Sequence, residues 1–381
     1  MKAKQTLVPY WRLSAFYFFF FASVGAFMPY WSVYLKSLEF SSVEIGQLMA
    51  ILMATKIISP NVWGWIADHH GKRLPIVRLG AFLSLLSFAA VFYADSFTFM
   101  AIVLIACGFF WNATLPQFEA TTLNHLGEES HRYTKIRVWG SVGFVVSVVL
   151  LGAVLESFGV GLLPYAIIVL MAGIWLSCML TPVDAEQPHD ESALSFKAVL
   201  LRPEVIALFV ICFLMQASHG PYYTFFSIYL EDAGYSRSVV GQLWALGVIA
   251  EVVFFLVAHK LFHVMSLKNF MILSLLLASL RWVLIAYFVD NLAILLFAQC
   301  LHAASFGIYH AVAIQFIHRF FVGRAQGRGQ ALYSSLSFGL GGAIGSLYSG
   351  YLWDGNPTAT YLVAAGLCAA GSLIAWRWLA R

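Results

Sequence analysis

The sequence predicts an all-α integral membrane protein, in which twelve transmembrane helices form two pseudo-symmetric six-helix bundles around a central cavity. The first observation is composition: 61% of the 381 residues are apolar and 10% are charged, whereas soluble domains carry about 25% charged residues. At about 20 apolar residues per spanning helix, this length holds roughly twelve spans and no sizeable soluble domain. The other two observations are the distribution of basic residues and an internal repeat.

Apolar windows bounded by charged or turn residues mark the spans. Eighteen basic residues lie in the termini, in the even-numbered gaps between windows or at the window ends that border them, whereas the odd-numbered gaps hold Lys36 and Arg237. Cytoplasmic loops carry the excess of Lys and Arg, so both termini are expected in the cytoplasm. The windows are 11–35, 44–66, 75–93, 98–121, 136–158, 162–181, 205–230, 239–260, 268–288, 292–316, 329–353 and 358–378.

The longest gap between windows separates six predicted spans from six others. It covers 182–204, is polar, and contains Pro182 and Pro188. We therefore expect an N-terminal six-helix bundle at 1–181, a cytoplasmic linker at 182–204 and a C-terminal six-helix bundle at 205–381.

The second half repeats part of the first. Shifting the chain by 195 residues aligns 22–56 with 217–251 with 11 identities, among them Gly46-Gln47-Leu48 over Gly241-Gln242-Leu243. Parallel six-helix repeats with a central site between them are the architecture of the major facilitator superfamily. The same alignment pairs Lys56 with Glu251, so equivalent positions of the two halves carry opposite charges.

The loop after the second span resembles the signature G-x-x-x-D-[RK]-x-G-R-[RK] of the same superfamily. It reads Gly-Trp-Ile-Ala-Asp-His-His-Gly-Lys-Arg, with His69 and Lys72 at positions where the signature has other basic residues. The resemblance implies a cytoplasmic gating motif, in which an acidic side chain and a basic cluster hold that side together. Its residues are Gly64, Asp68, Gly71, Lys72 and Arg73.

Further segments resemble the 3-phenylpropionate:proton symporter branch, near the lactose permease and nucleoside symporter groups. They are 29–35, 137–144, 235–251 and 280–282. The resemblance implies proton-coupled uptake of a small aromatic carboxylate, such as 3-phenylpropionate, by alternating access across a bacterial inner membrane. It also implies that polar side chains inside the spans carry function: Lys56, Glu119, His219, Glu251, Arg281, His302 and His310.

Charged groups at the centre of a span cost about 2.5–3.5 kcal/mol each on insertion scales, so they should pair or line water. We expect Glu251, Arg281, His302 and His219 to couple proton movement. In this hypothesis a substrate carboxylate competes with Glu251 for Arg281, and Glu251 then takes up a proton. The alternative is a purely structural ion pair between Glu251 and Arg281.

Other candidates have two interpretations each. Glu119 either serves transport or pairs with Arg137 at the mouth of the fifth span. His310 lies about 80° around an ideal helix from His302, so it either serves transport or is a packed polar residue. Lys56 is either a second anchor for an acidic substrate or a charge partner between the halves. The predicted substrate contacts are Lys56, Arg281, Tyr30, Trp31, Tyr222 and Tyr223.

Other classes of function have less support in the sequence than a proton-coupled symporter. The chain has no H-E-x-x-H motif and no G-x-S-x-G elbow with triad partners, so neither an enzyme nor a metal or cofactor site is expected. Within transporters, the rivals are a proton-coupled carrier of a neutral sugar or nucleoside and a drug:proton antiporter. The expected partners are a small substrate, the proton and the lipid bilayer, without nucleic acid, for a functional monomer.

Overall fold

The computed structural model describes residues 8–183, 196–261, 264–323 and 325–379. Every regular element in these ranges is a helix, as the sequence predicts. Ten helical stretches in them are long and apolar enough to cross a membrane. One of the ten, 97–158, contains two predicted spans. The stretch 325–353 is not among the ten, because glycine and serine residues lower its hydropathy.

The first six predicted spans each correspond to one helix, and the observed helices extend several of them by a turn or more. Side chains cap some helix ends: the hydroxyl of Ser96, for example, accepts a hydrogen bond from the backbone N–H of Phe99. The helices are α1 (Tyr10–Ser37), α2 (Ser42–His70), α3 (Arg73–Ala89), α4 (Phe97–Leu126), α5 (Tyr133–Phe158) and α6 (Leu163–Leu180).

The later spans are less regular than the sequence predicts, because three of them are interrupted. The short helix α7 (Phe196–Leu200) lies within the predicted linker, most of which is outside the described residues. The seventh span consists of α8 (Pro203–Ser218) and α9 (Gly220–Asp232), followed by α10 (Arg237–Leu261) and α11 (Leu267–Tyr287). The tenth consists of α12 (Leu292–Cys300), the π-helix η4 (Ala303–Ile308) and α13 (Tyr309–Phe320). The eleventh consists of α14 (Ala325–Ser334), the π-helix η5 (Ser335–Gly341) and α15 (Gly342–Trp353), and α16 (Pro357–Trp378) is the last.

The break in the seventh span has a local cause. Pro221 has no N–H to donate to the carbonyl of Ala217, and that carbonyl accepts a hydrogen bond from Tyr348 Oη at 3.1 Å instead. Gly220, at the start of α9, lies so close to the backbone of Gly345 that no side chain fits there. The break is therefore held against α15.

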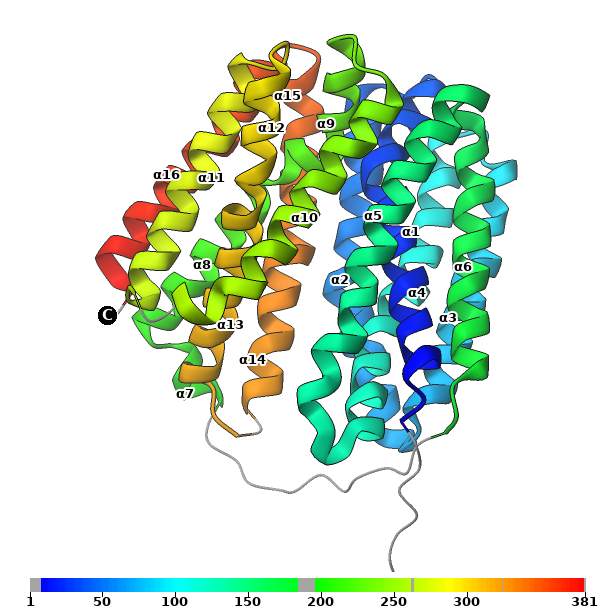
Figure 1. Cartoon of the computed structure of the whole chain (residues 1–381), viewed down its shortest axis with the longest axis vertical. Helices are drawn as coiled ribbons and strands as arrows, with labels where there is room; N and C mark the ends of the chain where they lie inside the picture. The colour runs from blue at the N-terminus through cyan, green and yellow to red at the C-terminus, as the bar shows by residue number, and fades with distance from the viewer. Residues whose placement is uncertain (1–7, 184–195, 262–263, 324, 380–381) are drawn as a thin grey trace, which may run out of the picture. The chain divides into compact units, whose positions relative to one another are not determined.

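The chain divides into two compact units. Unit 1 comprises Met1–Phe27, Ser59–Ser147 and Pro164–His189, and unit 2 comprises Met28–Ile58, Val148–Leu163 and Asp190–Arg381. In unit 1, α3 packs along α4, and in unit 2, α11 packs along α16 (Figure 1). The assignment of the six-helix bundles to 1–181 and 205–381 stays a prediction.

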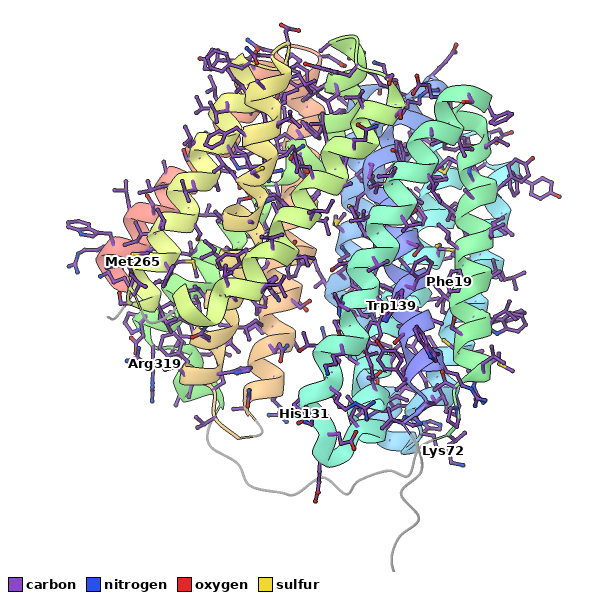
Figure 2. The ribbon with its side chains drawn as sticks, viewed as in Figure 1. Phe19, Lys72, His131, Trp139, Met265 and Arg319 are labelled. Carbon is purple, nitrogen blue, oxygen red and sulfur yellow. The ribbon has the colours of Figure 1, made fainter. Side chains whose placement is uncertain are left out.

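Two loops that the sequence places on one side of the membrane lie together in unit 1. Lys72 after α2 and His131 between α4 and α5 are found at the same end (Figure 2). Both belong to even-numbered gaps of the predicted topology. In unit 2, Arg319, in the last turn of α13, lies lower in the view than Met265, which precedes α11 (Figure 2).

Candidate functional site

The guanidinium group of Arg281, on α11, is the centre of a buried polar cluster in unit 2. The residue is fully buried. Its Nη2 donates to Oε1 of Gln299 at 2.8 Å, and its Nη1 donates to Oγ of Ser305 at 3.0 Å and lies 3.1 Å from Nδ1 of His302. The aromatic rings of Tyr222 and Trp282 lie 4.2 and 4.6 Å from its central carbon, which adds cation–π attraction.

His302 connects this guanidinium to Glu251. Because the guanidinium can only donate, Nδ1 of His302 must accept, and a neutral ring then carries its proton on Nε2. Nε2 lies 3.7 Å from Oε2 of Glu251, whose side chain on α10 is 19% exposed. The sequence predicted competition for Arg281 between Glu251 and substrate. In the structure the imidazole lies between the two charged groups.

The π-helix changes the expected position of His310. A π-helix has more residues per turn than an α-helix, so the 80° offset from His302 does not apply across η4. The rings of His302 and Phe306 stack at 5.5 Å, and those of Phe306 and His310 stack at 5.9 Å, with interplanar angles of 12° in both pairs. Nδ1 of His310 lies 2.9 Å from the hydroxyl of Tyr333. The two histidines therefore share one face of the helix.

His219 occupies the break between α8 and α9 and is fully buried. Its Nδ1 lies 2.8 Å from the carbonyl oxygen of Met215, so Nδ1 carries the proton of the neutral ring and Nε2 presents a lone pair. Among the described residues this Nε2 has no hydrogen-bond partner. The ring meets Trp282 edge-on at 4.9 Å and stacks on Tyr223 at 5.5 Å.

The aromatic candidates fall into two groups. Tyr222 stacks near the Arg281 guanidinium and donates to Gln299, while Tyr223 lies beside His219. The hydroxyl of Tyr30 instead donates to the carbonyl oxygen of Val148 at 2.7 Å and so joins α1 to α5. Trp31 is fully buried and packs against Tyr34. Tyr222 and Tyr223 are thus the two aromatic candidates with direct contacts to the Arg281 and His219 groups.

Lys56, on α2, is half-buried in unit 2, and its Nζ lies 3.5 Å from the sulfur atom of Met53 one turn earlier. The neighbouring residue Ile57 packs against Gly339 of η5. The α2 segment that carries Lys56 therefore lies against the eleventh predicted span.

Glu119 belongs to a separate cluster in unit 1. Its Oε1 lies 3.8 Å from Nε of Arg137 and accepts a hydrogen bond from the hydroxyl of Tyr133 at 3.1 Å. The guanidinium of Arg137 also lies over the ring of Phe21 at 3.9 Å. The pairing with Arg137 that the sequence offered as one interpretation is thus present.

The loop of the predicted gating motif has the tight turn that its glycine implies. Gly71 adopts a φ of +65°, in the left-handed region, just before α3 begins at Arg73. Nη1 of Arg73 donates to Oε1 of Gln117 on α4 at 2.6 Å, and Gly64 faces the same Gln117 side chain. Lys72 precedes α3 in an extended conformation. The side chain of Asp68 lies outside the described residues.

Sequence reasoning missed two members of the Arg281 cluster, Gln299 and Ser305. A glutamine one helical turn before His302 inside an apolar span was a usable signal, since buried amides need partners. Both side chains are fully buried and bond the guanidinium directly.

Comparison with known proteins identifies the family. Residues 10–363 match the model of the MFS_1 like family, and the chain belongs to that family of the major facilitator superfamily. A protein of Escherichia coli named as a probable 3-phenylpropionic acid transporter is 30% identical over 352 residues, covering 89% of each chain. The maltose permease of Geobacillus stearothermophilus is 26% identical and covers 92% of this chain and 88% of its own length.

Solved structures agree on the fold. A single-residue mutant of the nucleoside transporter NupG superposes with a TM-score of 0.87 at 17% identity, covering 97% of this chain and 99% of the other. A bacterial homologue of the human lysosomal transporter Spinster gives a TM-score of 0.70 at 14% identity, with 99% and 95% covered. The predicted fold class is therefore confirmed, and the chain is a multi-pass membrane transporter of small molecules.

Proposed function

We propose that this transporter is a proton-coupled symporter that takes up a small aromatic carboxylate, such as 3-phenylpropionate, by alternating access. The observation that carries the proposal is the fully buried Arg281, whose guanidinium is bonded to uncharged acceptors among the described residues. A buried cation is costly without a negative partner, so this position favours binding of an anion. The name of the Escherichia coli relative supports the same substrate class.

The coupling follows from the order Glu251, His302, Arg281. A substrate carboxylate that binds the guanidinium adds a negative charge beside His302, whose Nδ1 accepts a hydrogen bond from the same guanidinium. Glu251 then gains a negative neighbour in a poorly hydrated site, which favours its protonated form. His302 passes or holds the proton, and the Nε2 lone pair of His219 is a second acceptor. Proton and anion thus bind cooperatively, and by linkage each strengthens the other.

The remaining parts of the proposal come from the sequence. Tyr222 and Tyr223, with Tyr30 and Trp31 on α1, would contact the aromatic ring of the substrate, as amphipathic rings suit such a ligand. Lys56 would be a second anchor for the carboxylate. The gating motif would hold the cytoplasmic side, with both termini in the cytoplasm, in a monomer of the bacterial inner membrane.

Uptake by purified protein tests the proposal. Labelled 3-phenylpropionate is added to proteoliposomes under an inward proton gradient, with and without a protonophore. Accumulation above the leak of protein-free vesicles, abolished by the protonophore, is the expected result. Absence of uptake above that leak would contradict the substrate class.

A single substitution tests the coupling step. Glu251→Gln keeps the size of the side chain but cannot release a proton, so we expect substrate exchange to continue while accumulation under a proton gradient is lost. Glu128→Gln, in the exposed segment η2 (Gly127–Arg132), is the matched control and should accumulate substrate normally. Normal accumulation by Glu251→Gln would show that the coupling scheme is wrong.

A neutral substrate is the second candidate, because one relative is named a maltose permease and one solved neighbour a nucleoside transporter. Inhibition of uptake by unlabelled compounds distinguishes a carboxylate symporter from a carrier of a neutral substrate. Simple aromatic acids should inhibit uptake by a carboxylate symporter, whereas sugars and nucleosides should inhibit the alternative carrier. A drug:proton antiporter would instead accumulate its substrate in the proteoliposomes under an outward proton gradient.

A further inference from the structure

Gln299 is an uncharged member of the Arg281 cluster whose buried amide group is only partly hydrogen-bonded. It lies next to the end of α12 and is fully buried. Its Oε1 accepts two hydrogen bonds, from Nη2 of Arg281 at 2.8 Å and from the hydroxyl of Tyr222 at 3.2 Å. Its Nε2, by contrast, has no partner among the described residues, and the same is true of Nε of Arg281. Two buried N–H donors are therefore unsatisfied in one cluster.

Among the described residues no charged acceptor bonds the guanidinium, because Glu251 lies on the far side of His302. The guanidinium meets Oε1 of Gln299, Nδ1 of His302 and Oγ of Ser305, all of them uncharged acceptors when the imidazole is neutral. A carboxylate bonds a guanidinium more strongly than an amide oxygen does, and it offers about four acceptor positions. One carboxylate in place of the Gln299 oxygen would supply both the missing charge and the missing acceptors.

We propose that Gln299 stands in for the carboxylate of the transported anion, which displaces its Oε1 from Arg281 and then accepts a hydrogen bond from its Nε2. Gln299 is thereby the residue that selects a carboxylate over a neutral analogue. The substrate class in this inference rests on the proposed function. The shortage of negative charge at Arg281 does not depend on it.

The first test needs no substrate. Gln299→Glu has the same shape and supplies a fixed carboxylate, whereas Gln299→Met keeps the length and removes the hydrogen bonds. Thermal unfolding of the full chain is measured in detergent without added carboxylates. We expect Gln299→Glu to unfold about 2 °C or more above the wild type and Gln299→Met below it. A Gln299→Glu protein that unfolds at or below the wild-type temperature would overturn the inference.

The second test measures selectivity. Wild type and Gln299→Glu are titrated with 3-phenylpropionate and with its neutral amide, and binding is followed by tryptophan fluorescence. A fixed carboxylate at Arg281 should weaken binding of the acid at least about tenfold, the effect expected when a charged hydrogen bond is lost, and change binding of the amide far less. Equal affinity of both proteins for the acid would overturn the inference.

The two tests also separate this inference from the proposed function. If the wild type binds no aromatic acid, the proposed function fails. The unfolding comparison then decides by itself whether Gln299 takes the place of an anion at Arg281.

Discussion

Replacement of Gly46 by alanine should push α2 away from α15. A Cβ atom at Gly46 would lie 2.7 Å from Cα of Gly350, 2.8 Å from the carbonyl oxygen of Ser346 and 3.0 Å from N of Gly350. All three are backbone atoms, so no side chain can turn aside. Carbon atoms pack at about 3.5–4.0 Å, so the two helices must part by about 1 Å.

The free-energy cost of this overpacking sets the size of the shift between conformers. Forcing an extra methyl group into a packed contact typically costs about 1–3 kcal/mol. The predicted N-terminal bundle carries α2 and the predicted C-terminal bundle carries α15. In the proposed alternating access the two bundles part here in a second conformer, and that conformer avoids the cost. The substitution should therefore shift the equilibrium toward it by about 5- to 150-fold.

Labelling of a buried cysteine measures that shift. Ile45 is 2% exposed and lines a cleft of about 280 Å³ beside the contact, together with Ile228 and Trp353. Ile45→Cys is introduced with Cys300→Ser, because Cys300 is an exposed native thiol. A polar maleimide should react with this cysteine at least about fivefold faster when Gly46→Ala is present.

The control is an alanine at a glycine with open space around it. A Cβ at Gly366, on α16, meets no atom within 4 Å, so Gly366→Ala should leave the labelling rate unchanged. If Gly46→Ala labels no faster than Gly366→Ala and unfolds at the same temperature, the reasoning about this contact is refuted.

Two further substitutions test the strength of individual contacts. Ser218→Ala removes the acceptor of the buried Trp282 indole N–H, 3.2 Å away, and should destabilise the protein by about 1–3 kcal/mol, seen as a lower unfolding temperature. An unchanged temperature would mean that the indole finds another acceptor. Lys36→Met breaks an exposed ion pair with Asp232 at 2.6 Å, worth about 1 kcal/mol at most, so labelling at Ile45→Cys should rise less than about fivefold. That rise should vanish in 1 M salt, where surface charges are screened over about 3 Å, and its persistence would contradict an electrostatic origin.

Local properties of the chain were enough to predict the class of protein. Long apolar windows must become helices in a bilayer, because only internal hydrogen bonds satisfy their backbone. The same windows made Glu251, Arg281 and His302 conspicuous, since a polar group there is expensive unless it has partners. Gly71 was likewise conspicuous through its place in the loop motif, and the structure gives it a φ of +65° in a tight turn.

Helix interruptions were harder to foresee. The residues of η4 form a π-helix whose apolar composition differs little from that of its neighbours, so hydropathy does not reveal it. This segment decides that His302 and His310 share a face. The proline at 221 was a visible signal for the break beside His219, but hydropathy alone joined α8 and α9 into one span.

The sequence by itself thus determined that this chain is a helical membrane transporter with a few costly polar side chains, because hydropathy, charge bias and motif spacing are local or linear properties. Only the tertiary structure decided which of those side chains meet. His302 separates Glu251 from Arg281, and Gln299 takes the position nearest Nη2 of the guanidinium. Such partners depend on helix packing, rotamers and the turn of a π-helix, which bring together atoms far apart in the chain.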